Sequence, residues 1–273
     1  MRTRWIAVAI ALFCISGLAQ AAYNFDSDEQ GWNQATVGYN GGTYETLYPN
    51  VDADWTSSYG VGSPDGSIYQ SATTNWEGRA YWMGTDLTSA AASLGDLTGM
   101  SLQASVRSTA NWKGRVATDT VYARWTIASQ VGPSSTWNMW VSKAAYSIDL
   151  NAAEFGSGTD SDWRLKTIEM KAENFLPWWS TASMTFEEVL EQYTSVGLSI
   201  LPTAAGSDAA SNWNGASGTW GNGYTLLHYG AVATDGTATW GVDNVAAVPE
   251  PLSMLLFGGS VLGGLVIRRR RKL

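Results

Sequence analysis

Short runs of alternating apolar and polar residues recur along the chain, as expected of half-buried β-strands. Residues 99–107 and 121–127 follow this two-residue period, and so do residues 144–150, 165–170 and 196–201. Turn-forming residues separate the runs, at Asn40-Gly41-Gly42, Ser63-Pro64-Asp65-Gly66, Val131-Gly132-Pro133 and Asn214-Gly215. Many short strands joined by such turns predict an all-β domain, a jelly-roll β-sandwich.

One segment has the pattern of a short helix instead. Thr185 stands at an N-cap position and Glu188 follows three residues later, which is the capping-box spacing. Apolar residues then share one helical face: Phe186, Val189, Leu190 and Tyr193. We therefore predict a helix at about residues 186–194.

The N-terminus has the pattern of a signal peptide. Arg2 and Arg4 precede an apolar stretch, and Ala19 and Ala21 supply the small residues of a signal-peptidase site. We expect residues 1–21 to direct export through the Sec pathway and to be removed. The single cysteine, Cys14, would leave with them, so the mature chain would lack disulfides although its compartment permits them.

The C-terminus has an apolar run followed by basic residues. Residues 252–267 carry no charge and would span about 24 Å as a helix, slightly less than the usual membrane helix. The five residues 268–272 are all basic, and such a cluster stays cytoplasmic, which leaves the preceding domain outside. By hydropathy alone, an ordinary tail anchor fits equally well.

The order of these features adds a resemblance. Val248, Pro249, Glu250 and Pro251, followed by the apolar run and the arginine cluster, resemble the PEP-CTERM protein-sorting signal. Leu252 stands where that family often has serine or threonine. The resemblance implies a Gram-negative bacterium that makes exopolysaccharide, and processing near the motif by an exosortase, a membrane-embedded cysteine transpeptidase. The tail, residues 248–273, would then be a transient inner-membrane anchor for a protein of the cell surface or extracellular matrix.

The charge of the exported part limits its partners. Seven of the 16 Lys and Arg residues lie in the two terminal signals, whereas all 24 acidic residues lie between Asp26 and Glu250. The remaining nine basic residues leave a net charge of −15. This balance disfavours binding of nucleic acid or of another polyanion through a basic patch. Neutral glycans and cations are compatible with it.

Acidic residues at both ends of the domain, residues 22–247, suggest a calcium site. Asp26 and Asp28 open the domain and Asp243 closes it. Terminal strands of a sandwich often pair, and pairing would bring the three carboxylates together as hard oxygen ligands for a structural Ca²⁺ ion. The alternative is that Asp26 and Asp28 lie in a solvated turn and Asp243 in a tight one.

A second resemblance concerns the domain itself. Its motifs are Tyr81-Trp82-Met83, Leu94-Gly95-Asp96-Leu97, the strand from Met100, Trp163, the segment 184–190 and Val242-Asp243-Asn244-Val245. In this order they resemble the laminin IV (laminin B) module, a jelly roll related to galactose-binding-like and carbohydrate-binding domains. Residues 129–138 and 204–223 do not align with it. The resemblance implies adhesion or matrix architecture and supplies no catalytic residues.

No motif indicates catalysis. His228 is the only histidine, and no Gly-x-Ser-x-Gly nucleophile motif accompanies it. Glu187 and Glu188 could form a glycosidase pair in principle, but adjacent residues on a helix face different ways and the capping box explains Glu188. Phosphate-binding and dinucleotide fingerprints are absent from the sequence. We therefore expect a protein that is not an enzyme.

The 15 tryptophans are the remaining functional signal. Flat aromatic faces stack on the apolar C–H faces of sugars, and four tryptophans lie in segments that we expect to be loops: Trp178, Trp179, Trp213 and Trp220. The competing explanation is core packing, which buries most tryptophans. Two hypotheses follow: binding of exopolysaccharide through loop tryptophans, or a structural, adhesive biofilm role with protein partners and no glycan site.

Overall fold

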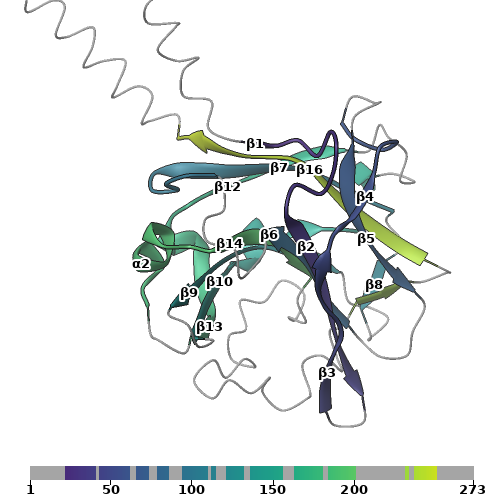
Figure 1. The fold of residues 1–273 in the computed structure, drawn as a ribbon, viewed down its shortest axis with the longest axis horizontal. Helices are drawn as coiled ribbons and strands as arrows, with labels where there is room; N and C mark the ends of the chain where they lie inside the picture. Colours follow the sequence, from purple (N-terminus) through teal and green to yellow (C-terminus); the bar gives the residue numbers. More distant parts are fainter. Residues whose placement is uncertain are drawn as a thin grey trace, which may run out of the picture.

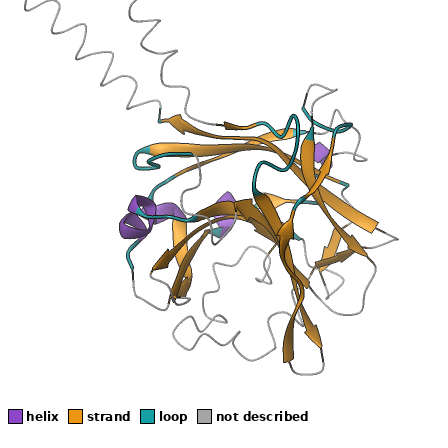
Figure 2. Cartoon of the chain, viewed as in Figure 1, coloured by secondary structure: helices purple, strands orange, loops and turns teal. Residues whose placement is uncertain are grey.

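The computed structural model is a sandwich of two antiparallel β-sheets (Figure 1), with very little helix (Figure 2). This confirms the predicted all-β sandwich. The structure describes residues 22–40, 43–61, 66–73, 79–85, 94–109, 112–114, 121–131, 136–155, 163–180, 184–200, 231–233 and 237–250.

The smaller sheet has six described strands. Their order is β12 (Arg164–Glu169), β7 (Met100–Ser108), β16 (Thr237–Pro249), β5 (Ser67–Thr73) and β4 (Asp54–Thr56), with β1 (Ala22–Tyr23) also paired to β16. Ala22 lies opposite Ala246 and Tyr23 opposite Val245. The two ends of the domain therefore pair, as the sequence predicts, and β1 lies beside β16 in Figure 1.

The larger sheet packs against the smaller one. Its order is β13 (Phe175–Ser180), β10 (Thr136–Ser142), β9 (Tyr122–Val131), β14 (Ser195–Ile200), β6 (Arg79–Thr85), β15 (Ala231–Ala233) and β8 (Trp112–Gly114). The short strand β11 (Ile148–Asp149) pairs with β9, and the hairpin of β2 (Trp32–Asn40) and β3 (Thr43–Asp52) joins the sheet through β6.

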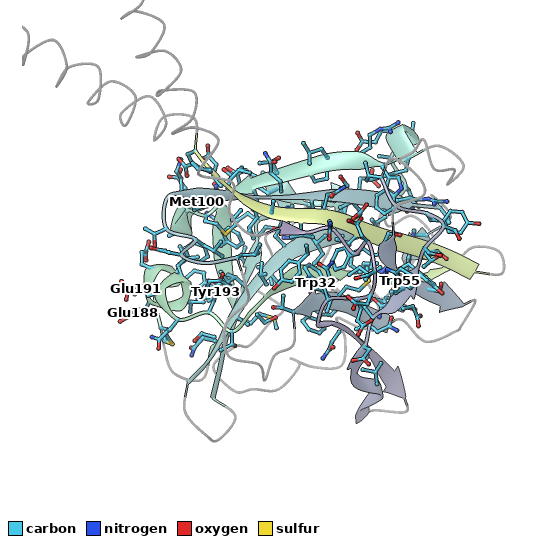
Figure 3. The ribbon with its side chains drawn as sticks, turned by 45° about the horizontal axis from the view of Figure 1, so that its top comes forward. Trp32, Trp55, Met100, Glu188, Glu191 and Tyr193 are labelled. Carbon is cyan, nitrogen blue, oxygen red and sulfur yellow. The ribbon has the colours of Figure 1, made fainter. Side chains whose placement is uncertain are left out.

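The core between the sheets is rich in aromatic rings. Trp32, Trp112 and Trp240 are among the largest fully buried side chains. The ring of Trp32, labelled in Figure 3, meets Phe25 edge-on at a centroid distance of 5.4 Å. Each buried aromatic side chain removes a large apolar area from water. These tryptophans therefore belong to the core, as the competing explanation predicts for most of them.

Four of the five strand predictions are confirmed, by β7, β9, β12 and β14. The prediction of one strand over residues 144–150 was wrong. Residues Ala144–Tyr146 form the 3₁₀ turn η1, and only Ile148–Asp149 pairs. The hydroxyl of Ser147 donates to the Ala144 carbonyl at 2.6 Å, and such local bonds compete with a strand ladder. Two further 3₁₀ turns are η2 (Ala153–Phe155) and η4 (Ala172–Asn174).

The predicted helix is confirmed as α2 (Phe186–Glu191), with its capping box. Thr185 Oγ1 accepts from the Glu188 N–H at 3.2 Å, and the Glu188 carboxylate accepts from the Thr185 N–H at 2.8 Å. The helix is shorter than predicted, because Gln192 leaves the helical conformation with φ −142°. Tyr193 is buried all the same.

Candidate functional site

A groove crosses the face of the smaller sheet that points away from the core. Its volume is about 350 Å³, within the range of small-ligand sites. Aromatic, hydroxyl and guanidinium groups line it, from Thr56, Tyr59, Ser67, Tyr69, Arg107, Thr109, Trp163, Thr239 and Gly241.

Strand register builds the middle of this groove. Tyr69 on β5 lies opposite Gly241 on β16, and Gly241 lies opposite Arg107 on β7. Their chain neighbours Ile68, Trp240 and Val106 are fully buried. Because side chains alternate between the two faces of a sheet, Tyr69 and Arg107 point outward.

The next row of the sheet adds hydroxyl groups. Ser71 lies opposite Thr239, and their side-chain oxygens are 3.1 Å apart. Thr239 also lines the groove. This side of the groove therefore offers donors and acceptors that suit a polyhydroxylated ligand.

A glycine allows an indole ring to lie close to the sheet. A Cβ atom at Gly241 would be only 3.1 Å from Cη2 of Trp163, so the ring packs directly over the glycine. Trp163 lies immediately before β12. Its indole N–H is buried and has no hydrogen-bond partner among the described residues. The ring is thus held against the sheet by packing.

The opposite wall comes from the segment between β4 and β5. The exposed ring of Tyr59 lies under the Arg107 guanidinium, at 5.1 Å from Cζ to the ring centroid, which is a cation–π contact. Two bonds hold this segment: the Val61 N–H donates to Asp243 Oδ2 at 2.7 Å, and the Ser67 hydroxyl donates to the Tyr59 carbonyl at 3.2 Å. The groove wall is therefore anchored to β16.

The three aspartates considered for calcium lie in different environments. Asp26 and Asp28 are exposed; Asp26 accepts from the Asn24 side-chain amide, and Asp28 accepts from the Gln30 N–H at 3.0 Å. Asp243 is 1% exposed. Across the described part of the chain, no group of three or more Asp, Glu, His or Cys side chains is arranged to hold a metal ion. The calcium site stays a prediction.

Asp243 lies at a break in strand register. The pairing of β16 with β7 shifts between Asp243 and Ala246, and Asn244 has a positive φ of 49°. The Asn244 N–H donates to Asp243 Oδ1 at 2.6 Å. This is a β-bulge, in which β16 has one extra residue relative to β7 after Asp243. Asp243 itself still pairs with Ser105 in regular register, so its carboxylate lies on the same outer face as Gly241 and anchors the groove wall.

The other predicted site residues lie elsewhere or outside the described residues. Trp178 and Trp179 belong to β13, a strand rather than the expected loop. Val248 and Pro249 end β16, and Glu250 follows it. The remaining ones lie outside the described residues: Ala19, Ala21, Trp213, Trp220, Pro251 and the predicted membrane helix. Where the structure is described, no helix is both long and apolar enough to cross a bilayer.

Sequence reasoning missed Tyr59, Tyr69 and Arg107. One weak signal was available: in β5, Ile68, Gln70 and Ala72 alternate with Ser67, Tyr69 and Ser71, so one face of the strand is polar and aromatic, although Gln70 interrupts the apolar face. That pattern does not reveal the order of the strands, so it cannot show that Arg107 on β7 lies across β16 from Tyr69.

Neither a protein-family model nor a curated protein sequence matches this chain. The geometry of the groove and the sequence signals at both ends are therefore the features that bear on its function.

Proposed function

We propose that this protein is an exported, non-catalytic protein of the cell surface or extracellular matrix that binds exopolysaccharide in the groove of the smaller sheet. One observation carries this proposal: three aromatic side chains, Tyr59, Tyr69 and Trp163, surround a groove that also presents Arg107 and threonine hydroxyls. A sugar ring can place its apolar face on an aromatic ring and direct its hydroxyl groups to the polar side chains.

The lining residues favour binding over chemistry. None of those described is Asp, Glu or His, whereas glycoside hydrolysis generally requires two carboxyl groups flanking the scissile bond. Most of the groove is built on paired strands. A rigid surface of this kind binds with little loss of conformational entropy.

The signals at the two ends of the chain account for how the protein would be exported and processed. In this proposal, signal peptidase removes residues 1–21 and an exosortase processes the motif at residues 248–251. The helix at 252–267 is a transient membrane anchor, with the basic residues 268–272 in the cytoplasm. The proposed jelly roll, of the laminin IV and carbohydrate-binding type, is supported by the two antiparallel sheets and the pairing of β1 with β16.

One observation favours the structural, adhesive alternative. β12 is the terminal strand of the smaller sheet as described, and Leu165 on it is 62% exposed. An exposed apolar side chain on a sheet edge is a feature of surfaces that pair with another protein. This role requires no glycan in the groove.

A titration separates these possibilities. The full chain in detergent micelles is mixed with the exopolysaccharide of its host, and the heat of binding is measured. We expect saturable binding that Tyr69→Ala abolishes or weakens and that the double variant Trp213→Ala, Trp220→Ala retains. Loss only in the double variant would move the site to residues 204–223, and no binding by the folded wild type would favour the adhesive role.

A further inference from the structure

The proposed processing motif is part of the folded domain. Val248 pairs with Ser101, and Pro249 pairs with Met100, at the start of β7. Val248 and Pro249 are half-buried, and Glu250 is 8% exposed. The Glu250 N–H also points to the Gly99 carbonyl at 3.5 Å. Strand pairing thus continues through the first half of the motif.

A lysine in the segment that follows β12 contacts the motif glutamate. Glu250 Oε2 lies 3.2 Å from Lys171 Nζ, and its other carboxylate oxygen is buried. Lys171 also contacts Glu169 at 2.7 Å. Hydrogen bonds to Glu169 and Glu250 raise the pKa of Lys171, which favours the charged form of the lysine.

Backbone pairing places this lysine beside the motif. The Met170 N–H donates to the Met100 carbonyl at 2.9 Å, and Pro249 lies opposite Met100 on its other side. Met100, labelled in Figure 3, therefore lies between the end of β12 and the end of β16. The ends of β12, β7 and β16 and the ion pair between Lys171 and Glu250 therefore lie together where the domain joins its proposed tail.

We propose that these contacts form a latch, made of Val248, Pro249 and Glu250 on β16 with Met100 and Lys171, that keeps the motif closed in the folded domain. The processing enzyme then has access to the motif only when the end of β16 separates from β7. An enzyme that cleaves a peptide bond needs the backbone of its substrate free, and a paired strand offers it only through local opening. This inference rests on the proposed processing of the tail.

Hydrogen exchange of the full chain in detergent micelles tests the latch without any enzyme. The amides of residues 246–248 and 250 are expected to exchange more slowly than in an unstructured peptide. Lys171→Met removes the ion pair with Glu250 and is expected to accelerate this exchange about twofold to fivefold. Glu169→Gln, which removes only the other partner of Lys171, is the matched control and should exchange like the wild type.

Two exchange results would overturn the latch: unprotected amides in the wild type, or equal rates in the wild type and Lys171→Met. A second experiment follows pulse-labelled chains in the native host and measures how fast they lose the tail. Lys171→Met should lose its tail about twofold to fivefold faster than the wild type and Glu169→Gln.

Faster exchange without faster processing would overturn the link between opening and cleavage. No processing of any variant, the wild type included, would overturn the proposed processing itself. The exchange result would still decide whether the latch exists.

Discussion

Replacing Asp243 with alanine tests how the groove wall is held. The carboxylate is 1% exposed and accepts the Val61 N–H at 2.7 Å and the Asn244 N–H at 2.6 Å. Alanine removes both acceptors. The Val61 N–H, which is partly buried, then has lost its hydrogen-bond acceptor. We therefore expect the Asp243→Ala variant to be less stable than the wild type.

The size of this effect follows from those bonds. A hydrogen bond to a charged group contributes about 1.5–3 kcal/mol to stability. Asn244 is exposed, and its N–H can turn to water, so only the Val61 bond counts in full. We expect the free energy of unfolding to fall by about 2–3 kcal/mol. In a domain of this size, that corresponds to a decrease in Tm of about 4–12 °C.

Thermal unfolding followed by circular dichroism measures this shift. Asp28→Ala is the control, because Asp28 is exposed and accepts a local bond from the Gln30 N–H. It should change the stability by no more than about 0.5 kcal/mol. Because Asp243 anchors the segment that carries Tyr59, its alanine variant should also bind polysaccharide more weakly at temperatures where it stays folded.

An unchanged Tm in Asp243→Ala would refute the anchoring role. The same scans, repeated with calcium and with a chelator, test the calcium prediction. Calcium that raises the wild-type Tm, with the gain lost in Asp26→Ala, Asp28→Ala and Asp243→Ala, would confirm the site. No response of the wild type to calcium would contradict it.

Three further predictions concern the fold. Gly197→Ala places a Cβ against the Met83 carbonyl on the paired strand, so it should cost about 3 kcal/mol in urea unfolding; a wild-type midpoint would contradict this. Thr185→Ala removes the capping box and should cost about 1 kcal/mol, which Thr185→Ser should largely restore in the same assay. Burial raises the pKa of Tyr193 above its ordinary value of 10.0, so its phenol ionises more easily in the unfolded chain. Stability should therefore fall as the pH rises above 10.0, and less steeply in Tyr193→Phe; identical alkaline unfolding profiles would contradict this.

Features that depend on local sequence were predictable. The capping box joins Thr185 to Glu188 within one turn, and strand alternation is visible in each run by itself. Residues 144–150 show the limit of that reasoning. They alternate like a strand, yet the Ser147 hydroxyl closes a local turn on Ala144, and the apolar pattern does not report this competing bond.

The groove depends on strand order, which the sequence does not reveal. Tyr69 and Arg107 lie in one row of the sheet, on either side of Gly241, only because β16 lies between β5 and β7. Asp243 is a similar case. Its place at the end of the domain made it a candidate metal ligand, and the structure shows that its carboxylate accepts from the Val61 N–H, on a segment 182 residues earlier in the chain. Both features arise from pairing between segments that are far apart in the chain.

Binding of exopolysaccharide by the groove is tested most directly by comparing the Kd of Tyr69→Ala with that of Tyr146→Ala. Tyr146 is an exposed tyrosine on η1 that does not line the groove. Aromatic stacking of a nucleobase contributes about 1–3 kcal/mol, and a similar loss here would raise the Kd about 5-fold to 150-fold. We predict that increase for Tyr69→Ala and a wild-type Kd for Tyr146→Ala. Equal affinities in the two variants would contradict the account.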